Sequence, residues 1–169
     1  MTPPGEPRWL DDTELVPWMR FSGMLLKLHS ALDAELQREA GLSFFTYLVL
    51  AGLSEAPERT LRMSDLAVLA NGSLSRLSHA VAKLERRGWV RRHPCPENGR
   101  ITLATLTDEG LDKIRASAPA HVESVRRLVI DVLSEEQLRR LGEISLLLLA
   151  GDGTRFAVLP RARPGRSRR

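Results

Sequence analysis

Residues 62–107 read RMSDLAVLANGSLSRLSHAVAKLERRGWVRRHPCPENGRITLATLT, and the order of local signals in this stretch decides the fold. A short helix is predicted to begin at Ser64, a residue type that caps helices, and the Asn-Gly pair at 71–72 predicts a tight turn. A second helix is predicted over 74–87, and Gly88 suits the position just beyond its C-terminus. The stretch therefore begins with two helices that are joined by a short turn.

Two short strands are predicted after these helices. Residues 89–93 and 101–105 are enriched in β-branched or aromatic side chains, and the polar segment 94–99 between them predicts a turn. A helix-turn-helix followed by such a hairpin is a winged helix-turn-helix. Together, a helix that fits the major groove and an arginine-tipped loop beside it can recognise duplex DNA.

Helices are also predicted on both sides of this stretch. Asp11 is expected to begin a helix that runs to about residue 40, with Glu14 as its capping-box partner. Ser43 begins a second helix, which is apolar on most sides and should be buried, and Pro57 stops it.

The C-terminal part is predicted to hold two more helices. Thr107 caps the first, in which Pro119 should produce a kink or a break. Ser134 and Gln137 form a second capping box, which begins a helix that ends near Ala150. The predicted fold class is mainly α with a small β-wing, a winged helix-turn-helix with N- and C-terminal dimerisation helices. The chain is predicted to divide into a flexible lead-in at 1–10, a domain at 11–150 and a basic, disordered tail at 151–169. Within the domain, the dimerisation helices are predicted at 11–40 and 107–150, and the DNA-binding lobe at 43–106.

Basic side chains are concentrated in two segments of the chain. Residues 62–100 hold eight basic and three acidic side chains, and residues 151–169 hold six basic and one acidic. The other two segments are acidic, with five basic and nine acidic side chains in 1–61 and six and eight in 101–150. This distribution is typical of a module that binds a polyanion, and the alternative is a basic face that is merely solvated.

Several other classes of protein are disfavoured. The N-terminal sequence MTPPGEPRW lacks the apolar run of a signal peptide, and the apolar run at 146–150 is too short to span a membrane, so a cytoplasmic location without membrane contact is predicted. No enzyme motif or cofactor motif is recognisable. The four histidines fall in different predicted elements and show no metal-ligand spacing. The single cysteine, Cys95, is interpreted as a passive loop residue, with a redox sensor as the alternative.

The two terminal helices predict a homodimer. The first helix would be about 44 Å long at 1.5 Å per residue, which a small winged-helix core cannot cover alone. The last helix, with the sequence LRRLGEISLLLLA, carries more leucine than a surface helix needs. A partner subunit would bury both helices, and the alternative is a monomer that packs its own ends together.

The second helix of the motif separates into an apolar and a polar face. The residues assigned to the core are Leu74, Leu77, Val81 and Leu84. Arginine on the other face can bridge guanine O6 and N7, while serine and lysine suit bases or phosphates. The residues predicted to contact DNA, including those of the wing, are Arg62, Ser64, Ser73, Ser75, Arg76, His79, Lys83, Arg91, Arg92, Asn98 and Arg100.

On these motifs, the chain resembles the multiple antibiotic resistance regulator (MarR) family of bacterial winged-helix repressors over about residues 12–150. The most specific matches are LSRLSHAVAKLERRGWVRR at 74–92 and NGRITLATLTDEG at 98–110. The family has Asp-x-Arg in the wing, so the resemblance gives Arg100 a minor-groove role. Asn98 replaces the usual aspartate and adds no charge attraction, so the wing is expected to be less preorganised.

The resemblance implies a homodimer, a pseudo-palindromic operator in double-stranded DNA and, in many members, a pocket for a small aromatic or phenolic effector. The candidate pocket residues are Trp18, Phe21, His29, Phe44, Phe45 and Tyr47, and the alternative for them is ordinary core packing. The sequence therefore predicts a sequence-specific transcriptional regulator, a repressor, that such an effector releases. The alternative is a winged-helix interaction module whose basic face docks an acidic protein.

Overall fold

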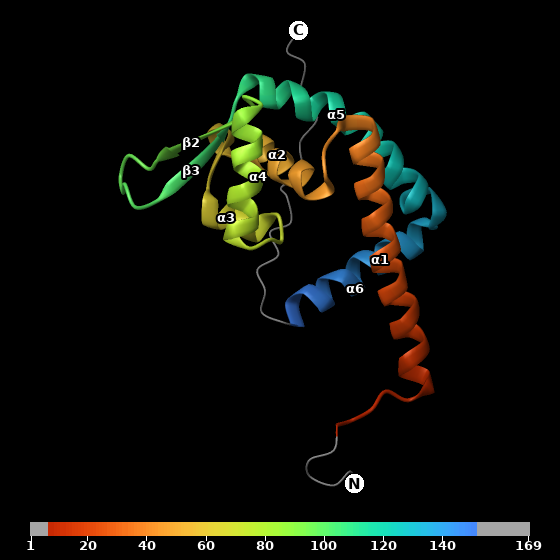
Figure 1. Ribbon diagram of the computed structural model, residues 1–169. Coiled ribbons are helices and arrows are strands. Elements are labelled where there is room, and N and C mark those ends of the chain that lie inside the picture. Colours follow the sequence, from red (N-terminus) through yellow and green to blue (C-terminus); the bar gives the residue numbers. More distant parts are fainter. Residues whose placement is uncertain (1–6, 152–169) are drawn as a thin grey trace.

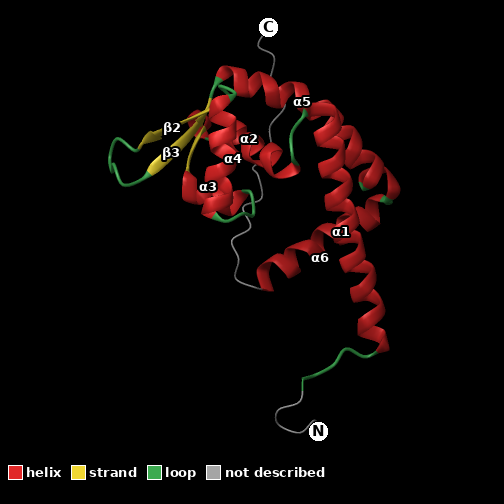
Figure 2. Ribbon diagram, in the orientation of Figure 1, coloured by secondary structure: helices red, strands yellow, loops and turns green. Residues whose placement is uncertain are grey.

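Six α-helices and a three-stranded antiparallel sheet form the part of the chain that the computed structural model describes, residues 7–151 (Figures 1 and 2). This mainly helical architecture with a small sheet confirms the predicted fold class. Along the chain, the elements are α1 (Asp12–Ala40), α2 (Phe44–Glu55), η1 (Pro57–Arg59), β1 (Thr60–Arg62), α3 (Met63–Leu69), α4 (Leu74–Arg86), β2 (Val90–Pro94), β3 (Thr102–Leu106), α5 (Asp108–Leu128), η2 (Ile130–Val132) and α6 (Glu135–Gly151).

Most of the predicted helix starts are confirmed. The side chain of Asp11 accepts hydrogen bonds from the first turn of α1, and Glu14 completes the capping box. The hydroxyl oxygens of Ser43 and Thr107 accept backbone N–H groups at the starts of α2 and α5. The cap that was predicted at Ser64 is wrong, because α3 already begins at Met63 and Ser64 instead donates a hydrogen bond to Asp65.

The sheet contains a strand that the sequence pattern did not predict. Strand β3 lies between β1 and β2 and is antiparallel to both. Thr60 of β1 lies opposite Thr105 of β3, and their hydroxyl groups share a hydrogen bond of 2.8 Å. At three residues, β1 is too short to show an alternating pattern. The β2–β3 hairpin projects from the body as the wing, and its strands start and end one residue later than predicted (Figure 2).

The core lies between α2, α3, α4 and the sheet, which together are called the winged lobe below (residues 44–106). Val49, Leu50 and Leu53 of α2 are fully buried there, and Leu77, Val81 and Leu84 of α4 pack against the same core. The assignment of Leu74 to this core is wrong, because its side chain is 56% exposed. Leu74 is the first residue of α4 and projects beyond the neighbours that cover Leu77.

Helix α5 connects the winged lobe with α1. It runs without interruption through Pro119, so the predicted break is absent, and Figure 1 shows the helix bending as it passes from the lobe towards α1. The carboxylate of Glu35 on α1 accepts hydrogen bonds from Ser124 and Arg127 of α5. These bonds hold the pKa of Glu35 below its usual range, chiefly through the Ser124 hydroxyl.

Helix α6 and the N-terminal half of α1 lie away from the winged lobe (Figure 1). The capping box of Ser134 and Gln137 at the start of α6 is confirmed by reciprocal hydrogen bonds of 2.9 and 3.2 Å. Within residues 7–151, no helix is long and apolar enough to cross a membrane. The predictions for residues 1–6 and for the basic tail from 152 onward lie outside the described residues.

Candidate nucleic-acid interface

Helix α4 presents a polar face to solvent. The five predicted residues of this face are all exposed: Ser73, Ser75, Arg76, His79 and Lys83. Ser73 is the N-cap of the helix, and its hydroxyl oxygen accepts the backbone N–H of Arg76 at 3.1 Å. The hydroxyl predicted to contact DNA therefore also fixes the first turn of α4. The helix offers backbone N–H groups and donor side chains at one end, which is an arrangement suited to phosphates and base edges.

Arg76 rests on an aromatic ring from α2. Its guanidinium carbon lies 4.1 Å from the centroid of the Phe45 ring, which is a cation–π distance. Phe45 itself is only 7% exposed. The sequence grouped Phe45 with the effector-pocket residues, but the structure places it beneath α4 instead.

The wing carries two exposed arginines. Arg91 lies on β2, and Arg100 lies in the loop at the wing tip. The side-chain oxygen of Asn98 accepts the backbone N–H of Arg100 at 3.1 Å, so Asn98 shapes the turn through the main chain and leaves the guanidinium free of that bond. Cys95 closes the loop from the other side, with its N–H donating to the carbonyl of Ile101 at 2.8 Å.

Arg92 forms hydrogen bonds with another residue of the protein. Its Nε and its backbone N–H donate to the two carboxylate oxygens of Glu85 at 2.8 and 2.9 Å, and a second guanidinium nitrogen lies 2.5 Å from Glu85. This arginine lowers the pKa of Glu85, first through the side-chain hydrogen bond. The pair connects α4 with β2. Sequence reasoning missed Glu85, since an acidic residue on a basic helix gives no sign of its partner.

Arg62 and Ser64 complete the predicted set. Both are exposed and lie where β1 ends and α3 begins, and the backbone of Arg62 takes the N-cap position of α3. The candidate interface therefore has three parts, contributed by the start of α3, the polar face of α4 and the wing.

The predicted effector-pocket residues fall into separate groups. Trp18 and Phe21 lie together on α1, with ring centroids 6.4 Å apart. His29 of α1 meets Phe44 of α2 edge to face at 5.5 Å, and Tyr47 belongs to the same neighbourhood.

His121 of α5 joins these residues and was not predicted to do so. Its ring lies 4.4 Å from Tyr47 and 5.9 Å from Phe44, measured between centroids. Its Nδ1 is buried and has no hydrogen-bond partner within the described part of the chain. Burial lowers the pKa of His121. His29, Phe44, Tyr47 and His121 are called the aromatic cluster below. The sequence pattern gave no partner for His121, because the cluster forms only when α5 packs on α2.

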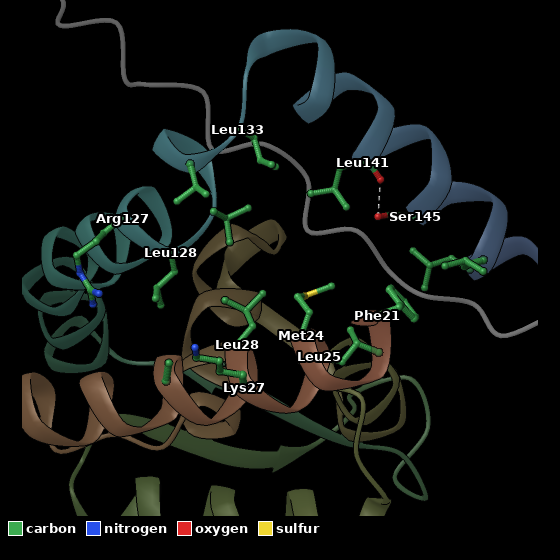
Figure 3. Close-up of a pocket in the computed structure, with 15 residues that line it drawn as sticks. Phe21, Met24, Leu25, Lys27, Leu28, Arg127, Leu128, Leu133, Leu141 and Ser145 are labelled. Atoms are coloured by element: carbon green, nitrogen blue, oxygen red, sulfur yellow. Dashed lines mark hydrogen bonds between the residues drawn. The ribbon is translucent and has the colours of Figure 1, made fainter. Parts of the chain in front are cut away.

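A large apolar groove lies between α1, the end of α5 and α6 (Figure 3). Its volume is about 920 Å³, and Figure 3 shows Phe21, Met24 and Leu28 of α1 facing Leu133 and Leu141 across it. This α1–α6 groove is lined by Phe21, Met24, Leu25, Lys27, Leu28, Ala31, Arg127, Leu128, Val129, Val132, Leu133, Leu141, Ser145, Leu148 and Leu149. The groove is separate from the aromatic cluster, which shares no residue with this lining.

The geometry defines a winged helix-turn-helix protein, and comparison with known proteins identifies its family. A sequence profile of the MarR family matches residues 40–101. The chain is 45% identical to Sco3205, a MarR family transcriptional regulator from Streptomyces coelicolor whose crystal structure is in complex with DNA. The alignment covers 94% of this chain and 99% of that one, with a TM-score of 0.84. AbsC, a MarR family transcriptional regulator from the same organism, is 39% identical over 85% of this chain and 99% of its own, with a TM-score of 0.78.

Relatives known by sequence agree. The chain is 30% identical to the HTH-type transcriptional regulator MhqR of Bacillus subtilis (strain 168), over 62% of this chain and 70% of that protein. It is 27% identical to the uncharacterized HTH-type transcriptional regulator YdgJ of the same strain, over 65% of this chain and 66% of YdgJ. The chain belongs to the MarR family of transcriptional regulators, as its sequence motifs predicted.

Proposed function

We propose that this protein is a transcriptional regulator that binds a pseudo-palindromic site in duplex DNA as a homodimer and represses the adjacent gene. The observation that carries the proposal is the exposed polar face of α4 beside a wing with free arginines. The DNA complex of Sco3205 supports the DNA-binding part of the proposal, since that regulator shares 45% of its aligned residues with this chain. Since its target is chromosomal DNA, we place the protein in the cytoplasm.

The contacts divide by element. Helix α4 enters the major groove, where the guanidinium of Arg76 can donate to guanine O6 and N7. The wing follows the backbone, and Arg100 enters the adjacent minor groove, where narrow A·T-rich segments hold enhanced negative potential. Ser73, Lys83 and Arg91 contact phosphates.

A second copy of the chain covers the α1–α6 groove. Apolar side chains stay exposed on both of its walls, among them Leu25 at 47% and Leu148 at 55%. Their neighbours Leu26 and Leu147, outside the lining, are 75% and 74% exposed. Contiguous apolar surfaces of this kind on a folded protein mark an interaction site. Two copies related by a twofold axis would place one α4 on each half-site, about one turn of DNA apart.

The alternative, a module that docks an acidic protein, is not favoured. It accounts for a basic face but not for the combination of a helix of groove-fitting shape, a wing and a DNA-bound relative. Steep salt dependence on duplex DNA would distinguish the two functions, since each phosphate contact changes the slope of log K against log salt by about 0.9.

Selection of bound sequences from random duplexes, followed by footprinting, tests the proposal. The expected result is a pseudo-palindrome with half-site centres about 10 base pairs apart. Arg76→Ala should lose selectivity at one position in each half-site. Arg115→Ala is the matched control, because it removes the same charge from an exposed position of α5 outside the predicted interface. Failure of the wild-type protein to select any sequence would overturn the proposal.

The aromatic cluster is the proposed place for a small aromatic or phenolic effector. It joins α1, α2 and α5 at the junction with the winged lobe, and its His121 Nδ1 is buried without a hydrogen-bond partner in the described part of the chain. A phenol that displaced part of this packing could donate its hydroxyl to this nitrogen and place its ring among the aromatic side chains. A panel of phenols tested for release of the selected duplex would decide this, with His121→Phe expected to abolish release.

A further inference from the structure

Phe45 is a buried aromatic residue that touches the proposed DNA-reading helix. It belongs to the core of the winged lobe, yet one face of its ring lies beneath the guanidinium of Arg76 at 4.1 Å. We propose that Phe45 is a positioning residue, which holds Arg76 in the orientation that reads one base pair in each half-site. This inference rests on the proposed function and extends it to a residue that does not reach the DNA.

Stacking on Phe45 leaves the hydrogen-bonding edge of Arg76 available. A guanidinium group is planar, so a ring beneath its face does not block the N–H groups, which point outward in the plane. Within residues 7–151, the side chain of Arg76 makes no hydrogen bond or ion pair with the protein. Its backbone is also held, because its N–H donates to Ser73. The backbone and the guanidinium face of Arg76 are therefore both held, while the N–H groups in the guanidinium plane remain available to a base.

The turn before α4 is shaped to admit the Phe45 ring. A Cβ atom at Gly72 would lie 2.5 Å from Cε2 and 2.8 Å from Cζ of Phe45. Contacts below 3.0 Å cannot be kept, so any side chain at this position would displace the ring. Gly72 thus serves the close approach of the ring and supports the position of Arg76 indirectly.

Preorganisation has a consequence for selectivity. A free arginine must lose rotamer freedom when it binds a base, and this loss offsets part of the contact. Because Phe45 orders the guanidinium before DNA binds, less rotamer freedom is lost when Arg76 contacts the correct base. Loss of the ring should therefore weaken discrimination between bases and leave sequence-independent affinity unchanged.

A double-mutant cycle tests the proposal. Phe45→Leu should lower the preference for the selected base pair at the Arg76 position about fivefold, the size expected for one cation–π contact. In the Arg76→Ala background, the same substitution should have no further effect on that preference. Affinity for unrelated duplex should not change in either case.

Two further variants separate positioning from loss of folding. Gly72→Ala keeps the ring but displaces it, and it should reproduce the loss of preference seen in Phe45→Leu. Val49→Ala is the control, since it truncates a fully buried side chain of the same helix but keeps the Phe45 ring under Arg76, and it should leave base preference intact. Folding is checked from the melting temperature of each variant.

Two results would overturn the proposal. One is a Phe45→Leu or Gly72→Ala protein that is folded and keeps full base preference while Arg76→Ala loses it. The other is an equal effect of Phe45→Leu with and without Arg76. Failure of the proposed function would look different, because the wild-type protein would then select no sequence at all.

Discussion

At the scale of single residues, two neighbouring arginines of the wing have different environments. Arg91 is exposed, whereas the side chain of Arg92 is 32% exposed and makes its hydrogen bonds to Glu85 and Ser78. A buried or partly buried carboxylate–guanidinium pair with several hydrogen bonds is a geometric constraint on the elements that carry it. Arg92 therefore holds the wing against α4, and Arg91 is the one available to phosphate.

Substitution of the two arginines should separate these roles. Arg92→Met should lower the free energy of unfolding by about 1–3 kcal/mol, because it removes charged hydrogen bonds and leaves Glu85 without its partner. Arg91→Met should change stability by less than about 0.5 kcal/mol. In DNA titrations at several salt concentrations, Arg91→Met should flatten the slope of log K by about 0.9, whereas Arg92→Met should not. A flattened slope for Arg92→Met alone would show that this arginine leaves Glu85 to bind phosphate.

The wing tip allows a second test. Arg100→Ala should weaken binding mainly to sites with A·T-rich flanks, because the narrow minor groove of such flanks attracts an inserted arginine. The measurement compares affinities for duplexes that differ only in the flanks. Asn98→Asp is the companion variant and should leave the flank preference intact, since an aspartate can also accept the backbone N–H of Arg100. An equal loss on every flank would assign Arg100 to phosphate contact only.

Residue identity predicted which side chains are exposed better than it predicted their partners. Every polar residue assigned to the exposed face of α4 is exposed. The partners of Arg92 and Arg76, Glu85 and Phe45, depend on packing between α4, β2 and α2, which residue periodicity does not encode. Leu74 was misplaced for a related reason, since the first residue of a helix can lie beyond the edge of its core.

At the scale of elements, α5 brings a titratable group against α2. His121 contacts Tyr47 and Phe44, and Glu35 and Glu39 of α1 lie in the same small cavity. Its pKa is lowered by burial, so the folded state favours the neutral imidazole. Since the unfolded chain then binds more protons, this contribution to stability is complete above the ordinary histidine pKa of about 6.5 and declines as the pH falls below it.

The pH dependence of unfolding tests this assignment. The free energy of unfolding should decrease as the pH falls below about 6.5, with a slope of up to about 1.4 kcal/mol per pH unit from this one group. His121→Gln should flatten this part of the curve, whereas His79→Gln, at an exposed position of α4, should not. Glu35 and Glu85 have lowered pKa values, so their contributions to the free energy of unfolding are lost at a lower pH than the contribution of His121. Parallel curves for the wild-type and His121→Gln proteins would contradict the assignment.

Capping residues and breakers predicted the helices well, because these signals are local. Gly41 ends α1 in the left-handed conformation, with φ at 63°. Strand β1 was missed, since its formation depends on β3, about 45 residues further along the chain. Pro119 did not break α5, because packing on α1 and α2 stabilises the helix beyond local preference.

At the scale of the whole molecule, the exposed apolar residues are concentrated on α1 and α6. Leu26→Asp and Leu147→Asp should each raise the dissociation constant of the proposed dimer at least tenfold, because a charge would be buried in an apolar interface. Val68→Asp is the matched control, since Val68 is 49% exposed but lies on α3 of the winged lobe. Sedimentation over a range of concentrations makes the measurement, and dimers unchanged by both substitutions would place the interface elsewhere.

The basic tail provides the last test at this scale. Its structure lies outside the described residues, but its sequence, RFAVLPRARPGRSRR at 155–169, carries six arginines. Arginines can neutralise phosphates, and phosphate contacts carry no sequence information. Deletion of residues 154–169 should therefore flatten the salt dependence and preserve the ranking of sites. An altered ranking would show that the tail reads sequence.

The bonds between Glu35 and Arg127 also set an order of events during synthesis. These residues are 92 positions apart, whereas every strand and helix of the winged lobe lies within residues 44–106. The lobe can close as soon as β3 has been made, but α1 must wait for the end of α5, and the α1 wall of the α1–α6 groove stays exposed even after α6 has been made. A nascent chain therefore carries an unburied leucine-rich helix throughout its synthesis, which exposes α1 to premature association with neighbouring chains.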